Sequence, residues 1–354
     1  PDYPCREPGH PLFQSSGTGC SRMNAPLVEI KDVSKRFAKR LDIAEKVAQK
    51  LGAGIREEIV HAVDEVNLTV KEGEVLGLVG ESGCGKSTLG RVVAGIHAPS
   101  SGQLLFQGKD VATMSRADKK AATLAIQMIF QDPFASLNPR MRVEDIIGEA
   151  PQVHGVVSRS EASDYVDDIM KKVGLDPSLK RRYAHQFSGG QRQRIGIARA
   201  LAVKPKFLVC DEAIAALDVS IQAQVINLFM DLREEFGLTY LFISHDLSVV
   251  EHIADRVAIM YLGRIVESAS TEEIFSAPKH PYTKALLAEA PRLDQRKRDF
   301  APIEGEIPSP LDPPKGCFFN PRCPHAQDLC RQEQPGLETF GDGHSVACHY
   351  WKTL

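Results

Sequence analysis

A glycine-rich segment that ends in a lysine and a serine is the first part of the sequence whose residue types suggest chemistry. Residues 80–87 read GESGCGKS and match the phosphate-binding pattern GxxxxGK[ST], here between an apolar run and a helical pattern. Glycines let backbone N–H groups surround phosphate oxygens, Lys86 can reach the outer phosphates, and Ser87 can ligate Mg²⁺. We therefore expect a nucleotide site with Mg²⁺. Its loop residues are Gly80, Ser82, Gly83, Cys84, Gly85, Lys86, Ser87 and Thr88.

Cys84 lies inside this phosphate loop, two residues before Lys86. A helix N-terminus and a neighbouring lysine both favour the thiolate form of cysteine. The sequence therefore predicts a pKa of the Cys84 thiol below its usual range and faster alkylation than at Cys210. The alternative role is that of a small buried filler.

Two adjacent carboxylates follow another apolar run. Residues 207–210 read FLVC and precede Asp211 and Glu212. Ligands of α/β sheets bind at the carboxyl ends of the strands, so Asp211 can hold hydrated Mg²⁺ and Glu212 can orient and deprotonate an attacking water. The alternative is a strand that ends in two solvated charges.

The segment FSGGQ at residues 187–191 permits two interpretations. Ser188 and Gln191 have the spacing of a capping box at the start of a helix. Gly189 and Gly190 are poor helix formers, and an anionic group that approaches the backbone at a helix N-terminus explains them best. The segment therefore predicts a capped helix, an anion site, or both.

An α/β core must position these residues. Apolar runs without alternation, flanked by helical stretches, predict buried parallel strands. They span residues 75–80, 126–130, 207–210 and 240–244. Residues 221–236 predict a crossover helix with Ser220 as its N-cap. Residues from about 136 to 186 predict a helical insert, in which Ser160 opens a helix and Gly174 closes it.

Composition narrows the function classes. The chain has 354 residues, 43% of them hydrophobic, which suffices for a core. Its 43 basic and 46 acidic residues give a net charge of −3, which disfavours nonspecific binding to nucleic acid or lipid headgroups. The sequence contains neither a signal peptide nor an apolar run near the roughly 18 residues of a membrane span. We expect a cytoplasmic protein whose membrane attachment depends on a partner.

Both ends of the chain differ from the middle. Residues 1–22 are rich in Pro, Gly and Ser and predict a disordered leader, with Met23 as the native start. Residues 291–314 have linker composition, and a separate module is expected from about Lys315. Four cysteines in that module predict a four-thiolate metal site in a reducing compartment, although the spacing does not choose the metal and unliganded thiols stay an alternative. They are Cys317, Cys323, Cys330 and Cys348.

Taken together and in order, these motifs resemble those of the ABC transporter ATPases. The residues that carry the resemblance are Gly80 to Ser87, Gln131 in IFQDP, Ser188 to Gln191, Asp211, Glu212, Asp218, and His245 in ISHD. The C-terminal part is similar to the oligopeptide and dipeptide importer branch. Its matching segments are HPY at 280–282, PSPLDPP at 308–314 and GCFFNPRCP at 316–324.

The resemblance implies a P-loop NTPase core with an antiparallel β subdomain and a helical subdomain. The ATPase domain would span residues 23–290 and a small cysteine-rich module residues 291–354. The implied activity is ATP hydrolysis coupled to import of di- or oligopeptides. The implied cofactors are ATP, Mg²⁺ and a [4Fe-4S] cluster at the four cysteines, with zinc as the alternative metal.

The resemblance also implies roles for single residues. Gln131 would contact Mg²⁺ and the water while sensing the membrane subunits, and His245 would reach the γ-phosphate. Phe37 falls near the aromatic residue that stacks on adenine, before an insertion over residues 38–60. Asp218 would lie at the seam between two ATPase subunits, where the segment 188–191 of one completes the site of the other.

The implied partners are two transmembrane permease subunits and a second ABC ATPase, either a related subunit or another copy. An extracytoplasmic solute-binding protein would act indirectly. The chain would lie at the cytoplasmic face of the cell membrane. The alternative is an ABC ATPase that acts on nucleic acid or ribosomes, which the near-neutral charge and the single cassette disfavour.

Overall fold

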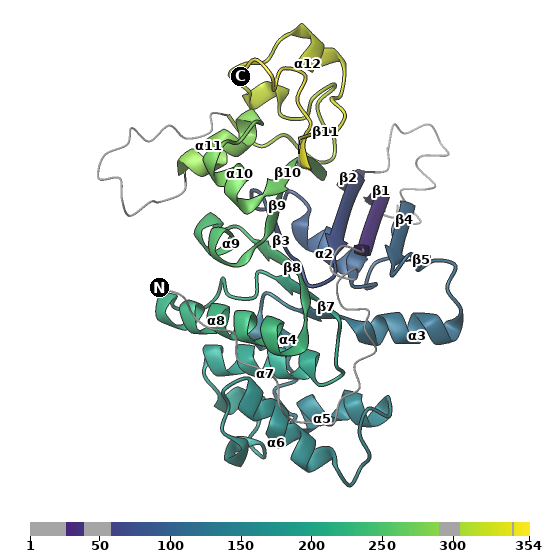
Figure 1. Cartoon of the computed structure of the whole chain (residues 1–354), viewed down its shortest axis with the longest axis vertical. Helices are drawn as coiled ribbons and strands as arrows, with labels where there is room; N and C mark the ends of the chain where they lie inside the picture. Colours follow the sequence, from purple (N-terminus) through teal and green to yellow (C-terminus); the bar gives the residue numbers. More distant parts are fainter. Residues whose placement is uncertain (1–25, 39–57, 290–304, 342) are drawn as a thin grey trace, which may run out of the picture.

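The computed structural model describes residues 26–38, 58–289, 305–341 and 343–354 (Figure 1). The leader expected over residues 1–22, with Met23, lies outside the described residues. So do most of the insertion expected over residues 38–60 and the first part of the proline-rich linker.

An eight-stranded sheet forms the centre of the molecule, in the order β11-β12-β10-β9-β3-β8-β7-β6. Its parallel strands are β3 (Val75–Val79), β6 (Ile126–Ile129), β7 (Phe207–Asp211), β8 (Thr239–Ser244) and β9 (Arg256–Tyr261). Four of these coincide with the four apolar runs, so the predicted parallel core is confirmed. Antiparallel strands β10 (Arg264–Ser270), β12 (His344–Val346) and β11 (Glu338–Phe340) extend the sheet at one edge.

A second, antiparallel sheet lies beside the first, as the resemblance implies (Figure 1). Its order is β2-β1-β4-β5, with β1 (Pro26–Ala38), β2 (Ile59–Lys71), β4 (Ser101–Phe106) and β5 (Lys109–Asp110). Along β2, the buried residues Val66, Leu68 and Val70 alternate with exposed ones, which is the period of a strand with one face against a core.

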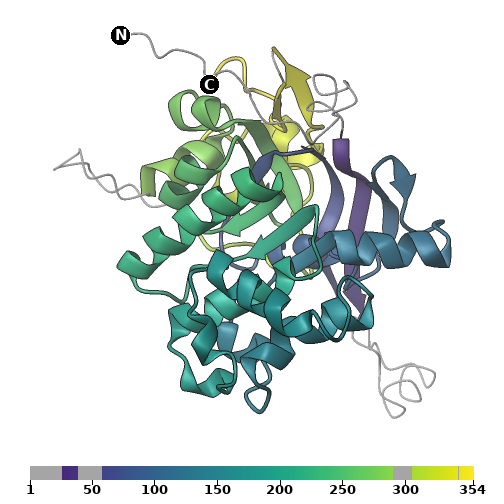
Figure 2. The ribbon, with the colours of Figure 1, turned by 60° about the horizontal axis from the view of Figure 1, so that its bottom comes forward.

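Helices flank the central sheet and also form a group of their own. The flanking helices are α2 (Lys86–Val93), α3 (Arg116–Ala125), α8 (Val219–Phe236), α9 (Leu247–Ile253), α10 (Thr271–Ser276) and α11 (Pro281–Glu289). The group comprises α4 (Pro133–Ser136), α5 (Val143–Val153), α6 (Ala162–Lys172) and α7 (Gly189–Leu201), with the 3₁₀ turns η1 (Pro177–Leu179) and η2 (Ala184–Gln186). In Figures 1 and 2 this group lies at the end of the molecule away from the C-terminal strands.

Two of the predicted helix starts are wrong. Helix α8 has Asp218 rather than Ser220 as its N-cap, because the Asp218 carbonyl already accepts the first helical hydrogen bonds. Helix α6 begins after Glu161, whose carboxylate accepts hydrogen bonds from the amide and hydroxyl of Ser158, so Ser160 lies in the preceding turn. Gly174 follows the helix with a φ of 71°, as a helix-ending glycine should.

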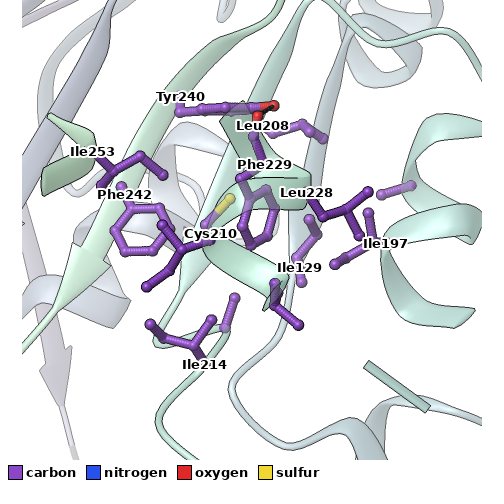
Figure 3. Packing of buried hydrophobic residues seen from close by; sticks show 14 of the residues in the cluster. Ile129, Ile197, Leu208, Cys210, Ile214, Leu228, Phe229, Tyr240, Phe242 and Ile253 are labelled. Carbon is purple, nitrogen blue, oxygen red and sulfur yellow. Dashed lines mark hydrogen bonds between the residues drawn. The ribbon is translucent and has the colours of Figure 1, made fainter. Parts of the chain in front are cut away.

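The core beneath the carboxyl ends of β7 and β8 is aromatic and aliphatic (Figure 3). The ring of Phe229 on α8 meets Tyr240 and Phe242 on β8 edge to face, with centroids 5.8 and 5.9 Å apart. The Tyr240 hydroxyl donates a hydrogen bond to the Phe229 carbonyl at 2.9 Å. Aromatic pairs of this geometry stabilise a core beyond the free energy of burial alone. The packing of α8 on β8 therefore holds in place the residues that follow β7 and β8.

The C-terminal region, residues 305–354, packs against the ATPase core. Strand β12 pairs with β10, and the Phe319 ring contacts Tyr261 and Tyr282 at centroid distances of 5.3 and 5.4 Å. The region also contains the 3₁₀ turn η3 (Asn320–Arg322) and α12 (Asp328–Gln332). The structure thus places the segment expected as a separate module in the same sheet and core as the preceding residues. None of the helices in the described ranges has the length and apolarity needed to cross a membrane.

Candidate active site

The phosphate loop joins β3 to α2, in the context that its pattern requires. Gly85 precedes the helix with a φ of 109°, which favours glycine. A Cβ on Gly85 would lie 2.1 Å from the Ala62 carbonyl oxygen, and one on Gly80 would lie 2.2 Å from the Met260 carbonyl oxygen. Both glycines are therefore required by the close approach of neighbouring backbone.

Lys86 is buried and crosses the loop. Its ammonium donates hydrogen bonds to the carbonyl oxygens of Gly80, at 2.7 Å, and Glu81, at 3.0 Å. A buried ammonium group needs such partners, because an unpaired buried charge is costly. The bonds hold the positive charge where the loop curves, which is the place that phosphate groups would occupy.

Ser87 and Asp211 meet although they lie on different elements. The Ser87 hydroxyl at the start of α2 donates to Asp211 Oδ1 at the end of β7, at 2.7 Å. Burial raises the pKa of Asp211, and the bond from Ser87 opposes that rise. Paired oxygen ligands in a buried site suit Mg²⁺, which prefers oxygen and would favour the ionised carboxylate.

Gln131 and His245, two further predicted residues, both lie next to Glu212. Gln131 Nε2 donates a hydrogen bond to Glu212 Oε2 at 2.5 Å, and His245 Nδ1 lies 3.5 Å from Glu212 Oε1. The φ of Glu212 is 45°, a left-handed conformation that is strained for a residue with a side chain. Its backbone N–H donates to the Ile243 carbonyl at 3.0 Å, which helps to fix that conformation.

A cavity of about 350 Å³ connects these residues to the antiparallel sheet. Its lining includes Ser82, Gly83, Gly85, Lys86, Ser87, Thr88, Gln131 and Glu212, together with Phe37, Ala62 and Pro310. The Phe37 ring at the end of β1 is 39% exposed and packs edge to face on His97, with centroids 5.5 Å apart. The cavity thus has an aromatic side chain in its lining, and the ammonium of Lys35 lies 5.1 Å from the centroid of that ring.

The segment 188–191 lies in a different place. Both hydrogen bonds of a capping box are present, from the Gln191 N–H to Ser188 Oγ at 3.4 Å and from the Ser188 N–H to Gln191 Oε1 at 3.1 Å. The capped helix is thus confirmed. The four residues line a second cavity of about 340 Å³ with Asp218, and this cavity shares no lining residue with the first. Within one chain, the structure does not bring this segment to the phosphate loop.

The predicted lowering of the Cys84 pKa is wrong, whereas the faster alkylation expected relative to Cys210 stays a prediction. Its thiol is buried, and burial raises its pKa, although Lys86 acts in the opposite direction. The loss of hydration of a thiolate outweighs the attraction of one lysine and the helix terminus. Burial also raises the pKa of Cys210. The sequence could not reveal how deeply the loop covers Cys84, its own fourth variable residue.

The four C-terminal cysteines come together. They line one small cavity of about 20 Å³. Burial raises the pKa of Cys317 to about 12, and it also raises the pKa of Cys323 and Cys348. In the part of the chain that the structure describes, however, no three His, Cys, Asp or Glu side chains are grouped closely enough to hold a single metal ion.

Three residues near the phosphate loop were not found by sequence reasoning. Arg322 forms an ion pair with Glu81, the hydroxyl of Tyr282 accepts a hydrogen bond from the Glu81 N–H at 3.0 Å, and Pro310 lines the cavity. All three lie in segments that resemble the peptide-importer branch, but nothing in their spacing connects them with residue 81.

Comparison with known proteins agrees with this geometry. Residues 63–215 match the family described as ABC transporter, and residues 266–330 match the one described as oligopeptide/dipeptide transporter, C-terminal region. The chain is 49% identical to the oligopeptide transport ATP-binding protein AppF of Bacillus subtilis, over 92% of this chain and 97% of that protein. It is 50% identical to the dipeptide transport ATP-binding protein DppF of Haemophilus influenzae, over 85% of this chain and 92% of that protein.

Solved structures with the same fold are ATP-binding cassettes. The structure of cbiO1 from Clostridium perfringens, part of the ABC transporter complex cbiONQ, has a TM-score of 0.58 and 28% identity and covers 71% of this chain and 91% of that one. The dimeric cassette MJ0796 bound to ADP and Pi has a TM-score of 0.58 and 26% identity, over 69% and 98%. Fold and site together define a phosphate-loop ATPase. The chain belongs to the ABC transporter family, among its ATP-binding proteins.

Proposed function

We propose that this ATPase is the motor subunit of a membrane importer for di- or oligopeptides. One family match carries the proposal. Residues 266–330 match a family described as the C-terminal region of oligopeptide/dipeptide transporters. The names of the relatives from Bacillus subtilis and Haemophilus influenzae support the same solute class. The alternative, an ABC ATPase that acts on nucleic acid, has no comparable support.

The site residues have separate tasks in ATP hydrolysis. Lys86 and the loop N–H groups bind the outer phosphates, and Phe37 stacks on the adenine ring. Ser87 and Asp211 would hold Mg²⁺, and the ion would supply charge that neutralises the phosphates. Glu212 orients the water and accepts its proton as the water oxygen attacks the γ-phosphorus, and the bond to the β-γ bridging oxygen breaks.

Gln131 and His245 act around Glu212. The hydrogen bond from Gln131 orients the carboxylate, and the exposed imidazole of His245, 3.5 Å from Glu212, would reach the γ-phosphate. Gln131 would also contact Mg²⁺ and the water when they are bound, and it would sense the membrane subunits. Because the carboxylate is held before the substrate binds, little reorganisation is needed during the reaction.

The complete site requires a second ATPase subunit. The segment 188–191 lines a separate cavity within its own chain, so it reaches a nucleotide only across an interface between two subunits. The glycines at the N-terminus of α7 then face the γ-phosphate, and Asp218 lies at the seam. The partner is another copy or a related ATPase, and closure of the pair over ATP provides the motion that drives transport.

Two permease subunits attach the ATPase to the cytoplasmic face of the cell membrane. The side chain of Phe134, three residues after Gln131, is 57% exposed, and the guanidinium of Arg192 lies 4.1 Å from its ring centroid. Phe134 is an exposed aromatic residue with a cation against its ring, and it lies close in sequence to Gln131, which orients Glu212. These features suit the interface with the permease subunits, because a movement there must be transmitted to the active site. A solute-binding protein outside the membrane supplies the peptide.

A [4Fe-4S] cluster is the metal group that suits the four cysteines. The cysteines that would hold it are Cys317, Cys323, Cys330 and Cys348, which line one cavity. A zinc ion needs four sulfurs about 2.3 Å from one point, whereas a four-iron cluster spreads its thiolate ligands around a larger body. Such a cluster would supply positive charge that favours the thiolates and would cross-link the C-terminal region.

The function is tested by transport. The chain is purified with its membrane subunits and reconstituted into vesicles with the solute-binding protein, and ATP-dependent uptake of labelled di- and oligopeptides is measured. We expect uptake that stops when Glu212 is replaced by glutamine. Copurification with RNA or DNA instead of membrane subunits, with no uptake of any peptide, would show that the proposal is wrong.

A further inference from the structure

An ion pair connects the C-terminal region to the phosphate loop. The guanidinium of Arg322 donates two hydrogen bonds to the carboxylate of Glu81, from Nη1 to Oε2 at 2.7 Å and from Nη2 to Oε1 at 3.0 Å. The Arg322 side chain is 4% exposed and that of Glu81 is 20% exposed. A bidentate arginine–carboxylate pair of this kind fixes orientation as well as charge. The pair therefore defines how the two segments meet.

Glu81 is held at every polar group. Its carboxylate is bound by Arg322, its N–H donates to the Tyr282 hydroxyl at 3.0 Å, and its carbonyl accepts from Lys86 Nζ at 3.0 Å. Glu81 directly follows Gly80, so its backbone sets the entry of the phosphate loop. Residues outside the loop thus fix the conformation of the residue that partly positions Lys86.

The charge of Glu81 matters as much as its position. A carboxylate in the phosphate loop repels the negative phosphates that the loop binds, and the repulsion is strong where water is scarce. Arg322 neutralises this carboxylate at hydrogen-bond distance. Without Arg322, the positive charge of Lys86 would have to offset the negative charge of Glu81 as well as that of Asp211 and Glu212.

A second contact brings the C-terminal region to the other end of the cavity. The His61 N–H on β2 donates a hydrogen bond to the Pro310 carbonyl at 3.1 Å, and Pro310 lines the cavity together with Phe37. The region therefore contacts the phosphate loop through Arg322 and lines the cavity itself through Pro310.

We propose that Arg322 is a positioning residue for nucleotide binding, which holds and neutralises Glu81 so that the phosphate loop accepts the triphosphate. Docking of the C-terminal region thereby sets the affinity of the chain for ATP. The proposal requires only that the chain binds ATP, and it does not depend on which solute is transported.

Opposite effects of the two partners test this proposal. The full chain with Arg322→Gln, Glu81→Gln, or both is titrated with Mg-ATP by calorimetry, and kcat and KM for ATP are measured. We expect Arg322→Gln to raise the Kd about tenfold, since an uncompensated carboxylate then lies in the loop that binds the phosphates, while kcat at saturating ATP stays within about twofold. Glu81→Gln should leave the Kd unchanged or lower it. The double variant should return to within about threefold of the parent.

The control and the conservative variant separate charge from packing. Arg331→Gln removes another arginine of the C-terminal region, whose partner Asp328 lies 3.0 Å away in an exposed pair, and it should leave the Kd unchanged. Arg322→Lys keeps the charge and should recover most of the affinity. A Kd within about twofold of the parent for Arg322→Gln would overturn the proposal.

A purely structural clamp predicts a different pattern, in which both single variants lower the unfolding midpoint and weaken ATP binding together. That result would also overturn the proposal. If Arg322→Gln does not fold, Glu81→Gln decides alone: a Kd raised about threefold or more contradicts the proposal, and an equal or lower Kd supports it.

Discussion

Gln131 donates a hydrogen bond of 2.5 Å to Glu212, although 81 positions separate them in the chain. Gln131 follows β6 and Glu212 follows β7, two neighbouring parallel strands, so their side chains meet at one edge of the sheet. The strained φ of 45° at Glu212 is maintained by this surrounding structure. The carboxylate is therefore held in one orientation before any substrate arrives.

Replacement of Glu212 by glutamine tests its role in hydrolysis. The variant preserves shape but removes the group that accepts the proton, so we expect ATP to bind normally and turnover to fall by roughly 10²–10⁴. The variant should also accumulate as a closed dimer with ATP. Steady-state phosphate release and nucleotide binding are measured on the same preparation.

The matched control is Glu234→Gln, which changes an exposed glutamate on α8 and should hydrolyse ATP like the parent. Turnover of Glu212→Gln within about threefold of the parent would show that another group activates the water.

Iron content tests the cysteine site. Chain purified without oxygen should be brown, absorb broadly in the visible blue and contain about four irons per chain. Cys323→Ser should lose the colour, whereas Cys210→Ala, far from the cysteine cavity in the central sheet, should keep it. Stoichiometric zinc without iron would decide for the other metal, and the absence of both would show that the thiols are unliganded.

Cys84 should resist alkylation in the folded protein. Burial raises the pKa of its thiol, so less thiolate is present at neutral pH than in an unfolded chain. We expect N-ethylmaleimide to modify Cys84 about tenfold more slowly, or slower still, in the native chain than in urea. Mass spectrometry of the modified peptides measures both rates. Equal rates would mean that the loop opens enough to hydrate the thiol.

His280 should make stability fall in mild acid. Burial lowers its pKa from 6.5 to about 3. Above pH 6.5 the imidazole is neutral in both states and contributes nothing to the pH dependence. Below pH 6.5 only the unfolded chain takes up the proton, so the free energy of unfolding should fall by about 1.4 kcal/mol between pH 7.5 and pH 5.5 from this residue.

Urea unfolding at several pH values measures this contribution. In His280→Gln it should vanish, so the difference in stability between parent and variant should shrink as the pH falls. His154→Gln, at an exposed histidine, should follow the parent. If the free energy of unfolding depends on pH in the same way in the parent and in His280→Gln, the pH dependence does not come from His280.

Local signals in the sequence account for much of the fold. Mainly apolar runs without alternation located β3, β6, β7 and β8, because strands that are covered on both faces have few polar positions. Helix starts were harder to place, since Asp218 and Ser220 are both acceptable caps and only the backbone conformation decides between them.

The sequence by itself determined the chemistry of the main site. The order of the phosphate loop, Asp211 and Glu212 requires a phosphate-binding turn and two adjacent acids at the end of one strand, and few other folds fit these local patterns. Only the tertiary structure decided what surrounds the residues of the phosphate loop. It buried Cys84, which reversed the sign of its pKa shift, and it brought Arg322 to Glu81 across 241 positions. Desolvation and long-range ion pairs depend on what surrounds a side chain in space, and no spacing along the chain records that.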